Sequence, residues 1–134
     1  MKAPGTLEFY QALADALNQD VEWPSLAQGL DCSMVHVYTE PVCKAFGLRF
    51  VGGRVEEVRE LDSASASADY VLTASPDSWH KVFSKVPKAR ASFLHFGLST
   101  GAVRFTGGFM KAYLAQVKAW EYLIDVVSLA KGLP

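Results

Sequence analysis

Charged residues are scarce in this sequence of 134 residues. They make up 20% of the chain, where about 25% is typical of globular domains. The 13 lysines and arginines nearly balance the 14 aspartates and glutamates, which leaves a formal net charge of −1. This balance argues against a partner held mainly by electrostatic attraction, such as nucleic acid or an anionic membrane surface. The length predicts one domain over residues 1–134.

Long apolar runs and cysteine-rich patterns are also absent. No uninterrupted run approaches the ~20 apolar residues that a membrane span needs. The N-terminal segment holds Glu8 and Asp15 in place of a continuous apolar stretch, so it does not resemble a signal peptide. The two cysteines, Cys32 and Cys43, match neither a disulfide framework nor a zinc-binding spacing. We therefore expect a cytoplasmic protein with reduced thiols and no membrane span.

The common catalytic motifs are missing. The three histidines, His36, His80 and His95, form no H-x-x-x-H pair, so we expect no metal site. There is no G-x-S-x-G elbow and no phosphate-binding loop, and we expect neither a nucleophilic triad nor a bound cofactor. A small isomerase-like enzyme that uses Asp69 or His36 as a base stays open. The competing interpretation of Asp69 is that it structures a loop.

What the sequence does contain is a series of helical and strand patterns. Helical spacing of apolar residues predicts helices over 4–18, 76–86 and 109–129. Alternation and turn residues predict strands over 33–39, 45–51, 54–61, 69–74, 93–96 and 102–106. Ser75 is a typical N-cap residue for the second helix, and Pro76 suits its first position. This order predicts an α+β fold, a mixed sheet with helices gathered against one face.

The second and third predicted strands form a hairpin around Gly52-Gly53, because two glycines tolerate the positive φ angles of a tight turn. Folding about this turn pairs Phe50 with Val55 and Arg49 with Glu56. Strict alternation would then put charged side chains of the third strand on the apolar face. We therefore expect a β-bulge or an exposed far end in this hairpin.

Aromatic residues are concentrated in the C-terminal half. Nine of the 16 lie between Trp79 and Tyr122. The predicted helix over 109–129 is apolar around most of its circumference, whereas packing on a sheet requires about a third. Three interpretations account for this excess: a dense core, an apolar cavity for a hydrophobic small molecule, or a docking face for a partner.

Two segments resemble the sterol carrier protein 2 family. The first is Ala68-Asp69-Tyr70-Val71-Leu72-Thr73-Ala74-Ser75 followed by Asp77-Ser78-Trp79, and the second is Gly101-Ala102-Val103-Arg104-Phe105-Thr106-Gly107. The sequence departs from the family pattern at Lys85-Val86-Pro87 and at Gly108. The resemblance implies a small, stand-alone bacterial member with a five-stranded mixed sheet, helices over one face and a lipid tunnel between the layers. It also implies non-enzymatic binding or transfer of sterols, fatty acids or acyl-CoA.

Together these observations predict an apolar ligand site in the C-terminal half. Its predicted lining residues are Phe83, Phe93, Phe105, Phe109, Met110, Tyr113, Val117 and Trp120. Trp79 is expected to anchor its helix to the sheet. The alternatives are an accessory subunit that docks a partner, a homodimer formed through the C-terminal helix, and the isomerase-like enzyme described above.

Overall fold

The computed structural model describes residues 4–62, 68–84, 101, 103–106 and 109–126. Its helices are α1 (Leu7–Gln19), α2 (Trp23–Leu26), α3 (Pro76–Ser84), α5 (Phe109–Ala115) and α6 (Val117–Asp125). Its strands are β1 (Cys32–Tyr38), β2 (Lys44–Val51), β3 (Arg54–Asp62), β4 (Tyr70–Ala74) and β5 (Arg104–Thr106). The strand predicted over 93–96 lies outside the described residues.

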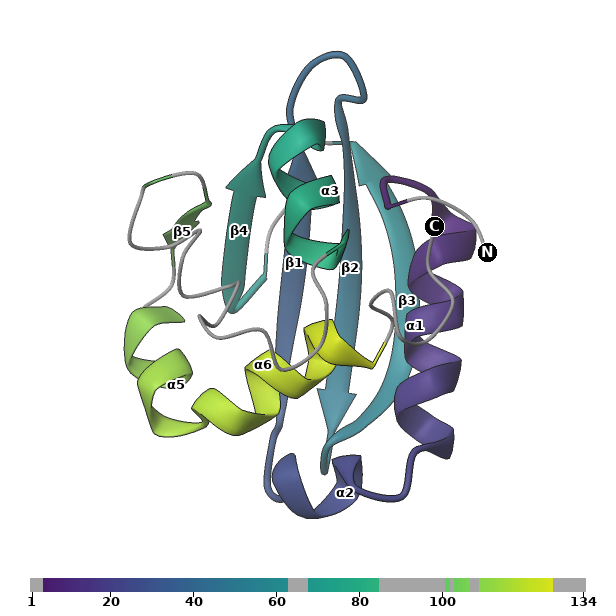
Figure 1. The fold of residues 1–134 in the computed structure, drawn as a ribbon, viewed down its shortest axis with the longest axis vertical. Helices are drawn as coiled ribbons and strands as arrows, with labels where there is room; N and C mark the ends of the chain where they lie inside the picture. Colours follow the sequence, from purple (N-terminus) through teal and green to yellow (C-terminus); the bar gives the residue numbers. More distant parts are fainter. Residues whose placement is uncertain (1–3, 63–67, 85–100, 102, 107–108, 127–134) are drawn as a thin grey trace.

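The five strands form one mixed sheet in the order β3-β2-β1-β4-β5. β1 pairs antiparallel with β2 and parallel with β4, while β3 and β5 complete the two edges through antiparallel pairs. Figure 1 shows α3 and α6 crossing one face of this sheet, with α1 lying along β3. The predicted α+β architecture, with helices over one face of a mixed sheet, is confirmed.

The first helix begins three residues later than predicted because Thr6 caps it. The Thr6 side-chain hydroxyl accepts a hydrogen bond from the backbone N–H of Phe9 at 3.2 Å, which satisfies one of the unpaired donors of the first turn. Tyr10, Leu13 and Leu17 follow at helical spacing and are fully buried. The amphipathic pattern seen in the sequence therefore faces the sheet.

The β2–β3 hairpin turns at Gly52 and Gly53, whose φ angles are +58° and +84°. Phe50 pairs with Val55 as predicted, but Arg49 pairs with Glu57 and not with Glu56. The predicted Arg49–Glu56 pair is wrong because the register shifts between Arg49 and Phe50. This irregularity is the expected bulge, and it places Val58 opposite the buried Leu48 and Glu57 opposite the exposed Arg49.

The segment predicted as one helix over 109–129 forms two helices within the described residues, α5 and α6. The prediction of a continuous helix is therefore wrong. α5 and α6 meet at an angle around Gln116, whose φ of −137° and ψ of +48° lie outside the helical region. The Trp120 indole Nε1 donates to the Ala112 carbonyl across this break at 3.3 Å. The break turns Trp120, Leu123 and Ile124 into the core, where each is at most 2% exposed. Residues beyond 126 lie outside the described part of the chain.

Candidate functional site

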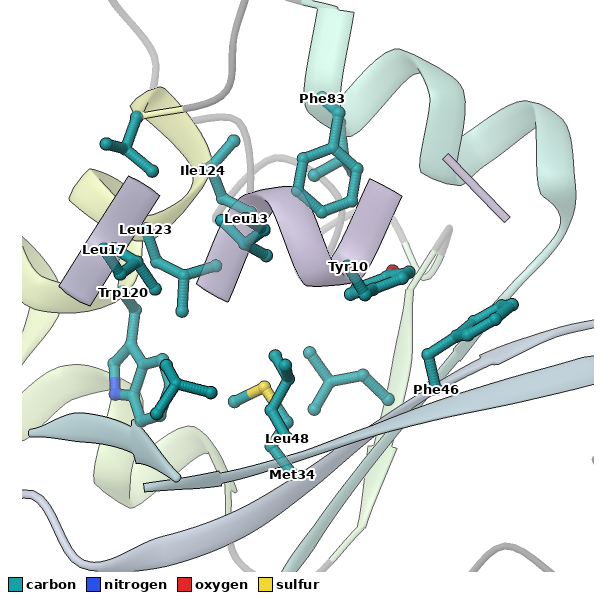
Figure 2. Packing of buried hydrophobic residues seen from close by; sticks show 14 of the residues in the cluster. Tyr10, Leu13, Leu17, Met34, Phe46, Leu48, Phe83, Trp120, Leu123 and Ile124 are labelled. Carbon is teal, nitrogen blue, oxygen red and sulfur yellow. The ribbon is translucent and has the colours of Figure 1, made fainter. Parts of the chain in front are cut away.

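The candidate site is the apolar layer between the sheet and the helices, here called the helix-facing layer. Figure 2 shows side chains from both sides pointing into it. The labelled residues are Tyr10, Leu13, Leu17, Met34, Phe46, Leu48, Phe83, Trp120, Leu123 and Ile124, and all are buried. They come from α1, β1, β2, α3 and α6, so a single layer joins segments that lie far apart in the sequence. Such aromatic and aliphatic surroundings are typical of sites for apolar small molecules.

The structure places the predicted lining residues in two groups. Phe83 lies on α3, whereas Phe105, Phe109, Tyr113 and Trp120 come from β5, α5 and α6. All five belong to the same apolar core or pack against it. Val117 begins α6 and is 36% exposed, so it lies at the rim of this core. Phe93 lies outside the described residues, and for Met110 only the backbone position is described.

Phe83 belongs to an aromatic cluster under α1 and α3. Its ring lies 4.8 Å from the ring of Phe9 in an edge-to-face arrangement and 6.1 Å from that of Trp79. Tyr10 stacks on Phe46 at 4.9 Å and connects this cluster to β2. These contacts place Phe83 in the middle of the helix-facing layer.

The second group of aromatic residues surrounds Phe109. The Phe109 ring packs edge-to-face against Trp120 at 5.3 Å and against Tyr70 at 5.6 Å. Phe105 is half-buried, with its ring 6.5 Å from that of Phe109, because β5 is a short strand at the sheet edge. Trp120 in turn contacts Phe50 of β2 at 6.0 Å. This group joins α5 and α6 to the sheet through a series of aromatic contacts.

Trp79 anchors α3 to the sheet, as predicted. Its indole Nε1 donates a 2.9 Å hydrogen bond to the backbone carbonyl of Val37 in β1. Its ring stacks on His36 at 4.3 Å between centroids, with 17° between the planes. The Ser75 hydroxyl accepts from the N–H of Ser78 at 3.1 Å, so the predicted N-cap holds the start of the same helix.

A buried polar chain runs beneath α1 and α3, and the sequence patterns did not predict it. The Tyr10 hydroxyl lies 2.7 Å from the Tyr38 hydroxyl and 2.9 Å from His36 Nδ1. His36 Nε2 lies 3.1 Å from the sulfur of Met34. Since a thioether only accepts, Nε2 carries the proton and donates, so that Nδ1 accepts from Tyr10. The position of His36 between Met34 and Tyr38 on an alternating strand was the signal that it faces the core.

Burial is the main influence on the protonation of the side chains in this buried polar chain. It lowers the pKa of His36 from 6.5 to about 3, which keeps the imidazole neutral near pH 7. Burial also raises the pKa of Tyr10 well above its usual value, and the neighbouring Tyr38 raises it further. With both His36 nitrogens engaged and its ring 2% exposed, the residue is poorly placed to take a proton from a substrate.

Asp69 forms a reciprocal contact with Ser33 at the start of β4 and β1. Its carboxylate accepts from the N–H of Ser33 at 2.9 Å, and the Ser33 hydroxyl accepts from the N–H of Asp69 at 3.0 Å. Asp69 is exposed and outside the helix-facing layer. This geometry fits the loop-structuring interpretation better than the role of a catalytic base.

Clustered metal ligands and membrane-spanning helices are both missing from the part of the chain that the structure describes. It holds no group of three or more histidine, cysteine, aspartate or glutamate side chains that could bind a metal ion. Among the same residues, no helix has the length and apolar character that crossing a membrane requires.

The arrangement of this sheet and its covering helices is that of a known fold. A crystal structure of sterol carrier protein 2 matches with a TM-score of 0.77 at 22% sequence identity, covering 92% of this chain and 96% of that one. The chain has the sterol carrier protein 2 fold. A conserved hypothetical protein from Thermus thermophilus, described as possibly a sterol carrier protein, matches with a TM-score of 0.75 at 22% identity. That match covers 91% of this chain and 85% of the other.

The same fold occurs in two more distant matches. A structure named UbiJ-SCP2 ubiquinone synthesis protein has a TM-score of 0.57 at 14% identity and covers 90% of this chain and 88% of that chain. The apo form of sterol carrier protein 2 from Yarrowia lipolytica has a TM-score of 0.55 at 17% identity, with 94% and 95% covered. No family model and no curated protein sequence matches the chain. The expectation of a sterol carrier protein 2 fold is therefore confirmed by structure and not by sequence similarity.

Proposed function

We propose that this protein binds an apolar, lipid-like ligand in the helix-facing layer and does not catalyse a reaction on it. The observation that carries the proposal is the sterol carrier protein 2 fold together with the aromatic composition of this layer. Sterols, fatty acids and acyl-CoA are the ligand classes that we propose to test. Transfer between acceptors and storage are both compatible with such a site.

We further propose that the ligand enters next to α5 and α6. These helices are seven and nine residues long, too short to be stable without tertiary packing. α5 packs beside β5, a three-residue strand at the edge of the sheet, and α6 continues from α5 across the sheet. Moving them outward would expose Phe109 and Trp120 to an incoming alkyl chain while leaving the β1–β2–β3 part of the sheet intact.

Apolar contact alone can supply useful affinity at such a site. Each buried CH₂ group contributes about 0.8 kcal/mol, so an acyl chain needs few polar contacts to bind. The polar groups that border the aromatic cluster include the Tyr113 hydroxyl, which donates to a Glu121 carboxylate oxygen at 2.8 Å. We expect ligand selectivity to depend mainly on the shape of the apolar walls.

The first test is native mass spectrometry on freshly purified protein, which reports the bound mass and the number of chains together. A co-purified lipid mass on a single chain supports the proposal. Delipidated protein that takes up no fatty acid, acyl-CoA or sterol contradicts it. A dimer without ligand would instead favour the docking alternative, in which the exposed Leu114 and Val117 of α5 and α6 contact a second copy.

The second test locates the ligand by tryptophan fluorescence. Binding next to α6 should change the emission of Trp120, so the response to a titrated fatty acid should largely disappear in Trp120→Phe. Trp23→Phe is the matched control, because Trp23 is equally buried but contacts the β2–β3 turn through its hydrogen bond to the Gly53 carbonyl. Thermal unfolding of both variants shows whether each remains folded. An unchanged response in Trp120→Phe places the ligand elsewhere.

A further inference from the structure

The face of the sheet opposite the helices carries a hollow of about 220 Å³, here called the far-face groove. Its lining residues include Val35, Gly47, Leu61 and Ala68, together with the charged side chains of Arg49, Glu57 and Arg59. Val35 belongs to a small apolar cluster of its own, against which Leu61 and Ala68 pack, and this cluster is separate from the helix-facing layer. The groove is therefore an independent feature of the fold.

Gly47 lines this space, and the backbone does not require a glycine there. Its φ lies outside the left-handed region. A Cβ atom added at Gly47 would lie 3.6 Å from Val35 Cγ2 and 3.7 Å from Leu61 Cδ1, which is ordinary van der Waals contact. Because glycine weakens a strand interior, its presence in β2, an interior strand of the sheet, needs another explanation. One recurring explanation is the close approach of a ligand.

Arginine side chains lie on the same face beside this apolar floor. Arg59 pairs directly with Gly47 across the β2–β3 ladder, and Arg49 follows Gly47 by two residues. Arg49 Nε lies 3.8 Å from a Glu57 carboxylate oxygen, with both side chains about half exposed, so this pair is weak. Arg59 forms no ion pair with any residue in the described part of the chain. The groove therefore joins an apolar floor to two arginines and one carboxylate, which leaves it with an excess of positive charge.

We propose that the far-face groove binds a small amphipathic anion. The apolar part of this ligand lies over Gly47, between Val35 and Leu61, and its carboxylate or phosphate group pairs with the guanidinium of Arg59. Arginine suits both anions because its planar fork donates two parallel hydrogen bonds. The site does not depend on lipid binding in the helix-facing layer, since the two lie on opposite faces of the sheet.

The test is a titration of the ¹⁵N-labelled full chain with hexyl phosphate, followed by backbone amide NMR. The expected result is a saturable shift of the Val35, Gly47 and Arg59 amides. Hexanoate should act in the same way, whereas inorganic phosphate and hexanol should each bind at least tenfold more weakly. If inorganic phosphate binds as tightly as hexyl phosphate, the apolar floor plays no part and the proposal is overturned.

Substitutions test the apolar floor and the arginine of the groove separately. Gly47→Leu fills the groove and should weaken hexyl phosphate binding at least tenfold, and Arg59→Gln should weaken it about fivefold. Arg54→Gln is the matched control, because it removes the same charge from β3 outside the groove and should leave binding unchanged. Gly47→Ala keeps the experiment interpretable if the leucine variant does not fold, since its Cβ meets only ordinary contacts. Gly47→Ala should weaken hexyl phosphate binding about threefold.

Two results would overturn the proposal without touching the proposed lipid binding. One is unchanged affinity for hexyl phosphate in both Gly47 variants. The other is a set of shifted amides confined to α5 and α6, which would place the probe in the helix-facing layer. Conversely, groove binding that persists in a chain that takes up no lipid would support this inference and contradict the proposed function.

Discussion

The Trp79 indole donates to the carbonyl of Val37 at 2.9 Å, although 42 residues separate the two in the sequence. α3 follows β4 in the sequence, and β1 is the strand that pairs with β4. The hydrogen bond therefore joins α3 to the strand beside β4. Because the indole also stacks on His36, the first aromatic residue of α3 connects the helix to both the backbone and a side chain of β1. This contact ties α3 to the sheet at two points.

Replacing Trp79 with phenylalanine should therefore destabilise the fold. The variant leaves the Val37 carbonyl without its buried donor and opens a small cavity beside His36. We expect a loss of about 2–3 kcal/mol in the free energy of unfolding, measured by urea denaturation. A loss below about 0.5 kcal/mol would show that the indole hydrogen bond does not hold α3.

The two turn glycines should respond differently to alanine. Both have positive φ, so Gly52→Ala should cost about 1 kcal/mol through backbone strain alone, since nothing lies within 4 Å of its Cβ. At Gly53 the added Cβ would also lie 2.7 Å from the Ala27 carbonyl oxygen, which is closer than real contacts allow. We expect Gly53→Ala to lose about 3 kcal/mol in the same denaturation measurement. Equal losses would mean that α2 moves away from the turn without penalty.

Acidification should destabilise the protein through His36. Burial lowers its folded-state pKa to about 3, below the usual 6.5, so only the unfolded chain binds this proton between these values. The stabilisation is complete above about pH 6.5 and is lost progressively as the pH falls toward 3. Relative to pH 7, the expected loss at pH 5 is about 2 kcal/mol from this group.

The control for this pH dependence is His36→Phe, which keeps an aromatic ring against Trp79 but cannot bind a proton. This variant should be less stable at pH 7, because the Tyr10 hydroxyl loses the Nδ1 acceptor. Its stability should nevertheless change much less than that of the original chain between pH 7 and pH 5. A parallel decline in both proteins would assign the acid sensitivity to other groups.

The two thiols should differ strongly in reactivity. Cys43 is exposed, whereas Cys32 is partly buried, and its pKa is raised to about 12 by burial and then by the nearby carboxylates of Asp69 and Asp31. Because the thiolate is the nucleophile, maleimide at pH 8 should label Cys43 at least tenfold faster. Peptide mass mapping measures both rates, and Cys43→Ser should lose the fast phase. Comparable rates would contradict the environment assigned to Cys32.

Much of the local structure was predictable because it depends on residues close in sequence. Ser75 and Pro76 define the start of α3, and Gly52-Gly53 defines a turn that pairs Phe50 with Val55. The continuous helix over 109–129 was not correct, since an apolar pattern alone does not reveal a break at Gln116. The predicted ends of β3 were nearly correct. Its register beyond the bulge was not predicted, because it depends on how β3 pairs with β2.

The candidate site was predicted in composition more than in arrangement. The concentration of aromatic residues was evident from the sequence, and the structure places Phe83 and Trp120 in the same core. The contribution of α1 was not predicted, because Tyr10 meets Phe83 and His36 only after distant segments pack together. Val117, chosen for its place in an apolar helix, lies at the rim because the helix turns at Gln116.

The order of amino acids was enough to establish the α+β class, the turn at Gly52-Gly53 and the cap at Ser75. These features follow from backbone preferences and from hydrogen bonds that span a few residues. The folded arrangement was needed to show that Asp69 pairs with Ser33, that His36 is buried and neutral, and that Gly47 leaves a groove beside Arg59. Each of these depends on which distant side chains meet, and only the pairing of the strands and the packing of the helices on the sheet determine that.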